Sequence, residues 1–272
     1  FADNQSNGCG GIRGGVAVRC RFLRNRGYNP LENNWNHGGG GGARDAVLSN
    51  CCFYGNTVFR RGGAVRGGTV VGCTVASNRA EHASNGEGGG IYGATSVENC
   101  VVVSNISVNG GGVYGSTTVR NSTIAYNKAS SGGGAYSSAL DDCVVEHNVA
   151  TAYESSNHGG AGGGLCGGSA TNTVFRDNSC SATYNSSLLK GCEIADTSVN
   201  AKVIDSCVIH SLRNGEISRA IGNVAYPNGY VTSNLYMITL GSVMRNSLIS
   251  NCVWKSLGGS FMNPAFFQPA SA

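Results

Sequence analysis

Gly88-Gly89-Gly90-Ile91-Tyr92-Gly93 and Gly110-Gly111-Gly112-Val113-Tyr114-Gly115 are two copies of one short pattern, 22 residues apart. Each leads into an apolar run that ends in Asn: SVENCVVVSN after the first copy and TVRNSTIAYN after the second. A third copy opens at Gly132-Gly133-Gly134-Ala135-Tyr136. Self-similarity at such a period is the signature of a repeat architecture, so the Asn that ends each run is the anchor for aligning the rest of the chain.

Aligned on that Asn, the chain contains seven copies. The Asn column is Asn25, Asn56, Asn78, Asn105, Asn127, Asn148 and Asn178. The position five residues earlier holds only small side chains: Cys20, Cys51, Cys73, Cys100, Ser122, Cys143 and Thr173. The positions three and eight residues before the Asn are apolar in every copy, with polar residues between them. This period-2 alternation predicts short strands with one buried face.

Each copy is therefore expected to contain three short strands, separated by Gly or Asn residues that tolerate the positive φ of a sharp corner. A unit of roughly 20–30 residues cannot bury its apolar face alone, so the copies must stack on one another. We predict an all-β fold, a single-stranded parallel β-helix (solenoid) of about ten or more rungs, each rung being one turn. The Asn column would form a hydrogen-bonded corner ladder. The Cys/Ser/Thr column would form an inner ladder, and Tyr92, Tyr114 and Tyr136 a short aromatic one.

The pattern divides the chain into three stretches of one elongated domain. Residues 1–187 hold the regular rungs, residues 188–260 continue with less regular ones, and residues 261–272 are a tail or the start of a following segment. The chain opens Phe1-Ala2-Asp3-Asn4, without an initiator Met or a signal segment, so we expect a processed or excised piece. Residues 1–11 offer no cover for a first rung that begins at Gly10-Gly11-Ile12. We therefore expect either that the native chain continues before Phe1 or that this rung pairs head-to-tail with a second copy.

Composition and charge limit the kinds of partner that the chain is expected to bind. The 272 residues include 43 Gly and carry a net charge of +4, but residues 1–80 hold ten Arg against three acidic residues. This basic end is either a solvated face or a contact for an anionic glycan, lipid head groups or nucleic acid, and we do not expect nucleic acid. No apolar run reaches the length of a membrane span, so no transmembrane segment is expected. The twelve Cys lack zinc-site spacing and predict buried free thiols, with a stray disulfide such as Cys166 with Cys180 as the exception.

Catalytic and metal sites find little support in the sequence. The one adjacent acidic pair, Asp141-Asp142, would diverge on a strand, and Glu98, Arg120 and Asp141 alternate in charge along one outward column, as a structural ion ladder does. The glycine clusters lack the Lys-Ser/Thr and the helix that a phosphate-binding loop needs. We therefore predict no enzymatic activity, no cofactor and no metal.

The pairing of a GGA or GGG element with an FxxN element resembles the repeat of the chlamydial polymorphic membrane proteins and related bacterial right-handed β-helix proteins. The FxxN copies are Phe22-Leu23-Arg24-Asn25, Phe53-Tyr54-Gly55-Asn56 and Phe175-Arg176-Asp177-Asn178, and Gly62-Gly63-Ala64-Val65 is one of the glycine copies. The end, Asn263-Pro264-Ala265-Phe266-Phe267-Gln268-Pro269-Ala270, resembles a degenerate DPxFxDP segment of secreted β-helix proteins. The resemblance implies a secreted or surface-displayed rod and brings no catalytic residue with it.

Insertions after the Asn corner distinguish the copies from one another. Residues 26–37, 79–87 and 149–161 form the longer ones, and per-repeat insertions commonly build the binding face of a solenoid. The candidate binding residues are Tyr28, Trp35, His37, His82, Tyr153 and His158. We expect a non-catalytic extracellular or cell-surface domain for adhesion or structural display, with a host surface, a glycan or another anionic surface as partner. The alternatives are a head-to-tail filament subunit and a polysaccharide lyase or hydrolase on a β-helix scaffold.

Overall fold

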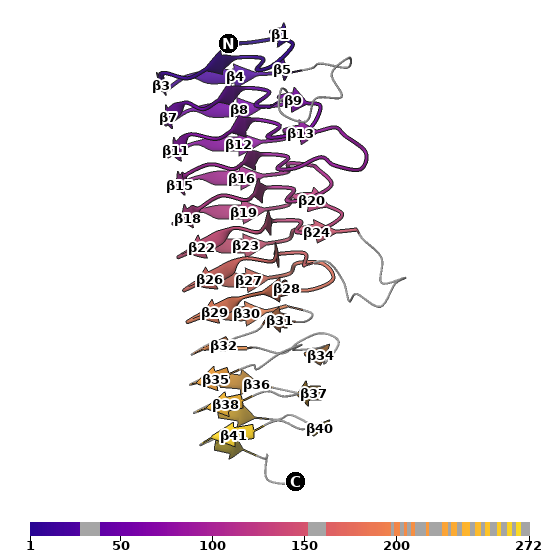
Figure 1. Ribbon diagram of the computed structural model, residues 1–272. Coiled ribbons are helices and arrows are strands. Elements are labelled where there is room, and N and C mark those ends of the chain that lie inside the picture. Colours follow the sequence, from indigo (N-terminus) through magenta and orange to yellow (C-terminus); the bar gives the residue numbers. More distant parts are fainter. Residues whose placement is uncertain are drawn as a thin grey trace.

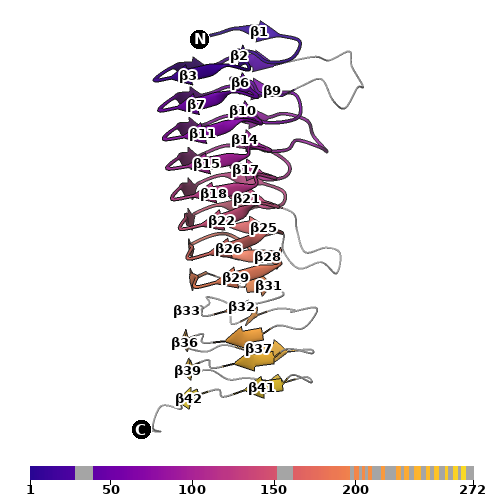
Figure 2. The same ribbon diagram turned by 60° about the vertical axis from the view of Figure 1, so that its left-hand side comes forward.

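The structure is a computed structural model that describes residues 1–27, 39–151 and 162–196, and after these the short strands between 199 and 267 that are named below. Every strand pair is parallel, and the described residues contain no helix. Figures 1 and 2 show the rungs stacked into one rod, with β1 (Gln5–Ser6) at one end and β42 (Ala265–Phe267) at the other. The predicted parallel β-helix is confirmed.

Three long sheets run along the rod. Sheet 1 follows the glycine clusters and consists of β2 (Ile12–Arg13), β6 (Ala43–Arg44), β10 (Val65–Arg66), β14 (Ile91–Tyr92), β17 (Val113–Tyr114), β21 (Ala135–Tyr136), β25 (Leu165–Cys166), β28 (Thr183–Ser186) and β31 (Val199–Ala201). Sheet 2 consists of β3 (Val16–Val18), β7 (Val47–Ser49), β11 (Thr69–Val71), β15 (Ser96–Glu98), β18 (Thr118–Arg120), β22 (Ala139–Asp141), β26 (Ser169–Thr171), β29 (Leu188–Lys190) and β32 (Ile204–Asp205). Sheet 3 consists of β4 (Arg21–Leu23), β8 (Cys52–Tyr54), β12 (Thr74–Ala76), β16 (Val101–Val103), β19 (Thr123–Ala125), β23 (Val144–Glu146), β27 (Val174–Arg176), β30 (Glu193–Ala195), β33 (Val208–Ile209), β36 (Tyr230–Thr232), β39 (Leu248–Ser250) and β42.

Shorter strands complete the rungs. A fourth side, which the sequence did not predict, follows the Asn corner in β1, β5 (Arg26–Gly27), β9 (Thr57–Val58), β13 (Arg79–Ala80), β20 (Lys128–Ala129) and β24 (Val149–Ala150). Towards the other end, one three-stranded sheet consists of β34 (Glu216–Ile217), β37 (Tyr236–Thr239) and β40 (Lys255–Ser256), and another of β35 (Ala225–Pro227), β38 (Val243–Arg245) and β41 (Ser260–Met262).

Sheet 3 has twelve strands and continues through the whole rod. Eleven steps of about 4.8 Å give a length of about 50 Å along the axis. Strands β41 and β42 pair with β38 and β39, so part of the stretch 261–272 belongs to the solenoid and is not a tail.

The corners are sharp because one residue at each has a left-handed backbone. Before the Asn column, Tyr126 and His147 have φ of 56° and 53°, and before the Cys/Ser/Thr column, Asn99 and Asn121 have φ of 53° and 44°. A non-glycine residue in this region costs about 1–2 kcal/mol. At these two corners, the ladders described below supply hydrogen bonds that offset this cost.

The core consists of similar apolar residues stacked along the axis. In sheets 2 and 3, from β3 to β30, the middle residue of each strand is buried, and Phe22, Phe53 and Phe175 are fully buried. The rings of Phe22 and Phe53 stack with centroids 4.5 Å apart and planes 2° from parallel. The ring of Phe1 continues this stack on Phe22, at 4.8 Å.

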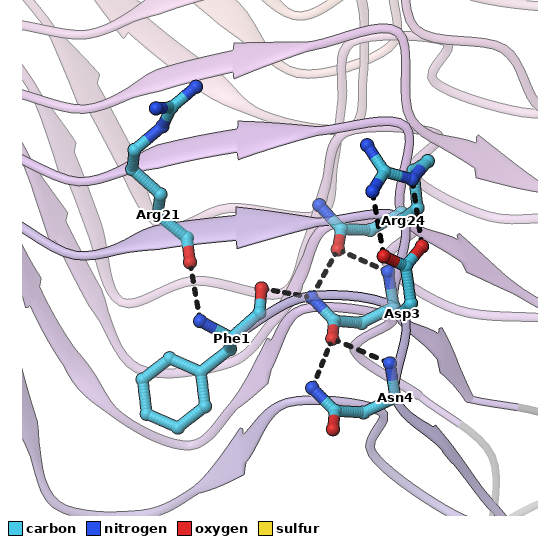
Figure 3. A network of polar contacts seen from close by, with 7 residues as sticks. Phe1, Asp3, Asn4, Arg21 and Arg24 are labelled. Carbon is cyan, nitrogen blue, oxygen red and sulfur yellow. Dashed lines mark hydrogen bonds and ion pairs between the residues drawn. The ribbon is translucent and has the colours of Figure 1, made fainter.

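The first rung is partly covered, in contrast to the expectation for residues 1–11: residues 1–6 lie on β4 and β5, whereas β2 and β3 are edge strands of sheets 1 and 2. Phe1-Ala2-Asp3-Asn4 is itself an FxxN copy and lies on Phe22-Leu23-Arg24-Asn25, and β1 pairs with β5. Figure 3 shows the contact: the ammonium group of Phe1 donates to the carbonyl of Arg21 at 2.9 Å, and the Asp3 carboxylate pairs with the Arg24 guanidinium at 2.7 Å. The alignment missed this copy because no glycine cluster precedes it.

Candidate functional site

The Asn column forms a continuous ladder of buried amides at the corner after sheet 3. The backbone N–H and the Nδ2 of each Asn both donate to Oδ1 of the Asn on the next rung, at 2.7 to 3.2 Å. Nδ2 also donates to a carbonyl of the preceding rung, as Asn105 does to Val75 at 2.9 Å. All seven predicted residues are in the ladder. Two members were missed: Asn4 extends it at one end, and Asp196 accepts from Asn178 at the other.

The Cys/Ser/Thr column forms a second ladder at the corner between sheets 2 and 3. The backbone N–H of Cys51 donates to Sγ of Cys73, and that of Cys100 donates to Oγ of Ser122, at 3.3 and 3.1 Å. Ser122 in turn donates to the carbonyl of Arg120 at 2.6 Å. The column therefore selects a small side chain that accepts a hydrogen bond from the neighbouring rung, whereas the sequence indicated small size alone.

The cysteines are thiols. The ten that lie in the described part of the chain are all free, Cys166 and Cys180 among them, so the disulfide suggested for that pair is not formed. Burial raises the pKa of the Cys143 thiol, and it raises the pKa of Cys166 to about 11. Both thiols are protonated and unreactive at neutral pH, because the thiolate is the nucleophilic form.

Of the candidate binding residues, His82 alone lies in the described residues. Tyr28, Trp35, His37, Tyr153 and His158 lie outside them. The Nδ1 atom of His82 accepts hydrogen bonds from the backbone N–H groups of Ser84 and Asn85, at 3.1 and 3.0 Å, and its ring packs edge-on against Phe59. This histidine therefore shapes the turn of its own loop.

The carboxylates of the outer faces pair across rungs. Nε of Arg120 lies 3.0 Å from Oδ2 of Asp141, and Nε of Arg176 lies 2.5 Å from Oε2 of Glu146. Glu98, the third member of the predicted ion column, accepts from the hydroxyl of Ser96. Within residues 1–27, 39–151 and 162–196, no three His, Cys, Asp or Glu side chains are grouped closely enough to bind a metal ion.

A surface pocket of about 450 Å³ opens at the Asn corner of the last regular rungs. His147, Asp177 and Asp196 contribute its titratable groups. The imidazole of His147 is stacked on the ring of Tyr126, with centroids 4.9 Å apart, and Asp196 is engaged by the Asn ladder. The pocket thus combines one imidazole with two carboxylates, and both His147 and Asp196 take part in structural contacts.

On the outside of sheet 1, the predicted tyrosine ladder is present. The rings of Tyr92 and Tyr114 have centroids 5.3 Å apart, and those of Tyr114 and Tyr136 are 5.0 Å apart with planes 1° from parallel. In register with these residues, Arg66, Arg44 and Arg13 continue the column on the preceding rungs. This is the longest outward column of large polar side chains on the described rungs.

Comparison of the chain with protein families, curated proteins and solved structures found no match. Among the described residues, no helix is long and apolar enough to span a membrane.

Proposed function

We propose that this protein is a non-catalytic β-helix rod that acts outside the cell or on its surface, in adhesion or structural display. The proposal rests on one observation: the residues that stabilise the rod and the residues that form its outer surface occupy separate positions on the same strands. Inward positions repeat from rung to rung, whereas outward positions on the same strands range from Val16 to Glu98 and Arg120. A rod built in this way can present almost any outer face without disturbing its core.

The pairing of outer carboxylates supports a non-catalytic role. A glycosidase or lyase needs carboxylates that converge on substrate, with at least one available to move a proton. Here Asp141 and Glu146 are engaged by arginines of neighbouring rungs. Burial raises the pKa of the ladder thiol Cys143 and keeps it protonated and slow to react.

The resemblance to the chlamydial polymorphic membrane proteins favours the same function and location. It rests on the GGA/FxxN copies, whose residues are the ones that build the solenoid. Head-to-tail association rests on an open edge at the first rung. Residues 1–6 cover β4 and β5, whereas β2 and β3 are edge strands of their sheets, so the filament alternative is kept.

Attachment of beads that display the chain to cultured epithelial cells tests the proposal. We expect attachment above that of beads carrying a scrambled-surface variant, and no new reducing ends or unsaturated uronates when the soluble chain is incubated with polysaccharides. Product formation from a polysaccharide would favour the enzyme instead. Light scattering at two salt concentrations tests the filament alternative, for which growth in particle mass with concentration is expected.

A further inference from the structure

The outward residues of sheet 1 form a column that changes abruptly in chemistry. We call Arg13, Arg44, Arg66, Tyr92, Tyr114 and Tyr136 the Arg–Tyr column. Three arginines occupy consecutive rungs, and three tyrosines occupy the next three. Parallel register places each side chain beside its neighbour, one rung of about 4.8 Å away.

The arginine half concentrates positive charge. Arg61 adds a fourth guanidinium at the junction: its Cζ lies 5.1 Å from the centroid of the Tyr92 ring, and its Nε lies 2.7 Å from the carboxylate of Glu87. Asp45 pairs with Arg44 at 3.1 Å. Burial, together with repulsion from Arg44 and Arg61, lowers the pKa of Arg66.

The arginine half differs in charge pattern from sheet 2. Like charges on facing positions of neighbouring strands are destabilising. In sheet 2, Arg120 lies in register between Glu98 and Asp141, so that opposite charges alternate. A local departure from such an alternation is expected where function requires it.

The tyrosine half presents hydroxyl groups and ring edges. Both faces of the Tyr114 ring are covered, by Tyr92 and by Tyr136. Burial raises the pKa of the Tyr114 and Tyr136 hydroxyls, which therefore remain hydrogen-bond donors at neutral pH. Beside the ladder, a Cβ placed on Gly93 or Gly115 would meet no atom within 4 Å, so the flank of the column is open.

We propose that the Arg–Tyr column binds an acidic polysaccharide that lies along the axis of the rod. The guanidinium groups bind its sulfate or carboxylate groups. The tyrosine hydroxyls bind the hydroxyl groups of its sugar rings. This inference rests on the proposed adhesive function and names the class of ligand. Single-stranded nucleic acid fits less well, because its bases stack on free aromatic faces and the ladder has used those faces.

Binding of the whole chain to heparin, polygalacturonate, neutral dextran and poly(dT) tests the proposal. The column variant is Arg13→Gln, Arg44→Gln and Arg66→Gln combined. Its matched control, with the same loss of charge, is Arg19→Gln, Arg21→Gln and Arg79→Gln, at exposed positions outside sheet 1. We expect heparin or polygalacturonate to bind, dextran not to bind, and the column variant to bind about tenfold or more weakly than the control variant. The salt dependence of log K should flatten by about 2 to 3 in the column variant.

A second variant separates a built site from plain ion exchange. Tyr114→Phe keeps the stack and the charge but removes one hydroxyl, and we expect a loss of affinity of several-fold with an unchanged salt slope. If the column variant does not fold, as judged by circular dichroism, Arg66→Gln alone takes its place and should weaken binding more than Arg79→Gln does. A preference for heparin identifies sulfate as the bound anion, and a preference for polygalacturonate identifies carboxylate.

Equal losses in the column and control variants would overturn the inference, and so would tighter binding of poly(dT) than of both acidic polysaccharides. The inference and the adhesive function can be contradicted by different results. Beads that attach to cells while neither polysaccharide binds would remove the inference and leave the function standing. Polysaccharide binding without any attachment of the beads to cells would contradict the adhesive function and leave the inference standing.

Discussion

Asn105 and Asn127, on consecutive rungs, are joined by two hydrogen bonds to a single oxygen. The backbone N–H of Asn105 and its Nδ2 both donate to Oδ1 of Asn127, at 2.9 and 3.0 Å. Both residues are fully buried. The same arrangement repeats from Asn4 to Asn178, so the left-handed residue before each Asn is followed by a satisfied N–H group on every rung.

Replacing Asn127 with Ala should therefore destabilise the rod at its centre. The change leaves the backbone N–H of Asn105 without an acceptor, removes one of the two acceptors of its Nδ2, and removes the donor to the carbonyl of Val102. Buried groups without partners cost about 1–3 kcal/mol each, so we expect a loss of about 2–4 kcal/mol. The measurement is the urea midpoint, with the m-value checked for a change in cooperativity. The exposed Thr117→Ala is the control, and a shift no larger than that of the control would show that the ladder does not carry stability.

The Cys/Ser/Thr ladder predicts how much stability two different substitutions of Ser122 should cost. Ser122→Ala removes the acceptor for the N–H of Cys100 and the donor to Arg120, whereas Ser122→Cys keeps both functions in the form that most rungs use. We expect the Ala variant to lose about 1–3 kcal/mol and the Cys variant to lose less. Denaturation of the two variants side by side gives the answer. Equal stability of the pair would mean that size alone selects this column.

How far the sequence could predict the structure depended on whether a feature repeats. The Asn, Cys/Ser/Thr and Tyr columns each recur at one offset in the repeat. Because stacking places equal offsets in contact, all three columns could be predicted from the sequence alone. Asn4 and Asp196 were missed because each lacks one part of the pattern: a glycine cluster before the first, and an Asn side chain in the second.

Features that do not repeat from rung to rung could not be predicted from the sequence. The fourth side of the rung consists of two-residue strands such as Lys128–Ala129, too short to show an alternation. The arginine half of the Arg–Tyr column was visible only as an excess of Arg in residues 1–80, because the spacing from Arg13 to Arg44 and from Arg44 to Arg66 varies with the insertions between rungs. Register, which the structure supplies, was needed to place them beside one another.

Stability should fall at alkaline pH in a way that depends on Cys166. Its pKa is raised by burial to about 11 from the ordinary value of 9.0, so the folded state favours the neutral thiol. This contribution is fully present below pH 9 and is lost as the pH rises towards 11. We expect the thermal midpoint to fall over that range, and to fall less in Cys166→Ser. Parallel pH profiles for the two proteins would contradict the assignment of this titration to Cys166.

Thiol labelling gives an independent test of the same burial. Cys180 is exposed, whereas Cys143 and Cys192 are buried in the ladder. At pH 8, a disulfide reagent should label Cys180 much faster than either, and Cys180→Ser should remove that fast reaction. Labelling in urea provides the total for comparison. Rapid labelling of Cys143 in the native chain would show that the inner ladder opens to solvent.

Replacement of glycine by alanine should reduce stability strongly at Gly112 and less at Gly115. A Cβ on Gly112 would lie 2.6 Å from the carbonyl oxygen of Gly134 and 2.9 Å from Nδ2 of Asn127, so it would push two rungs apart at the Asn ladder. A Cβ on Gly115 would meet no atom within 4 Å, and the strain there comes from its φ of 60° alone. We expect Gly115→Ala to cost about 1–2 kcal/mol. Gly112→Ala should cost about 3 kcal/mol or more, because backbone lies on one side and a buried ladder on the other. Urea denaturation compares the two, and recovery of soluble Gly115→Ala without soluble Gly112→Ala is the same result in its extreme form. If both variants lost equal stability, the close approach of the rungs would not be the reason for glycine at Gly112.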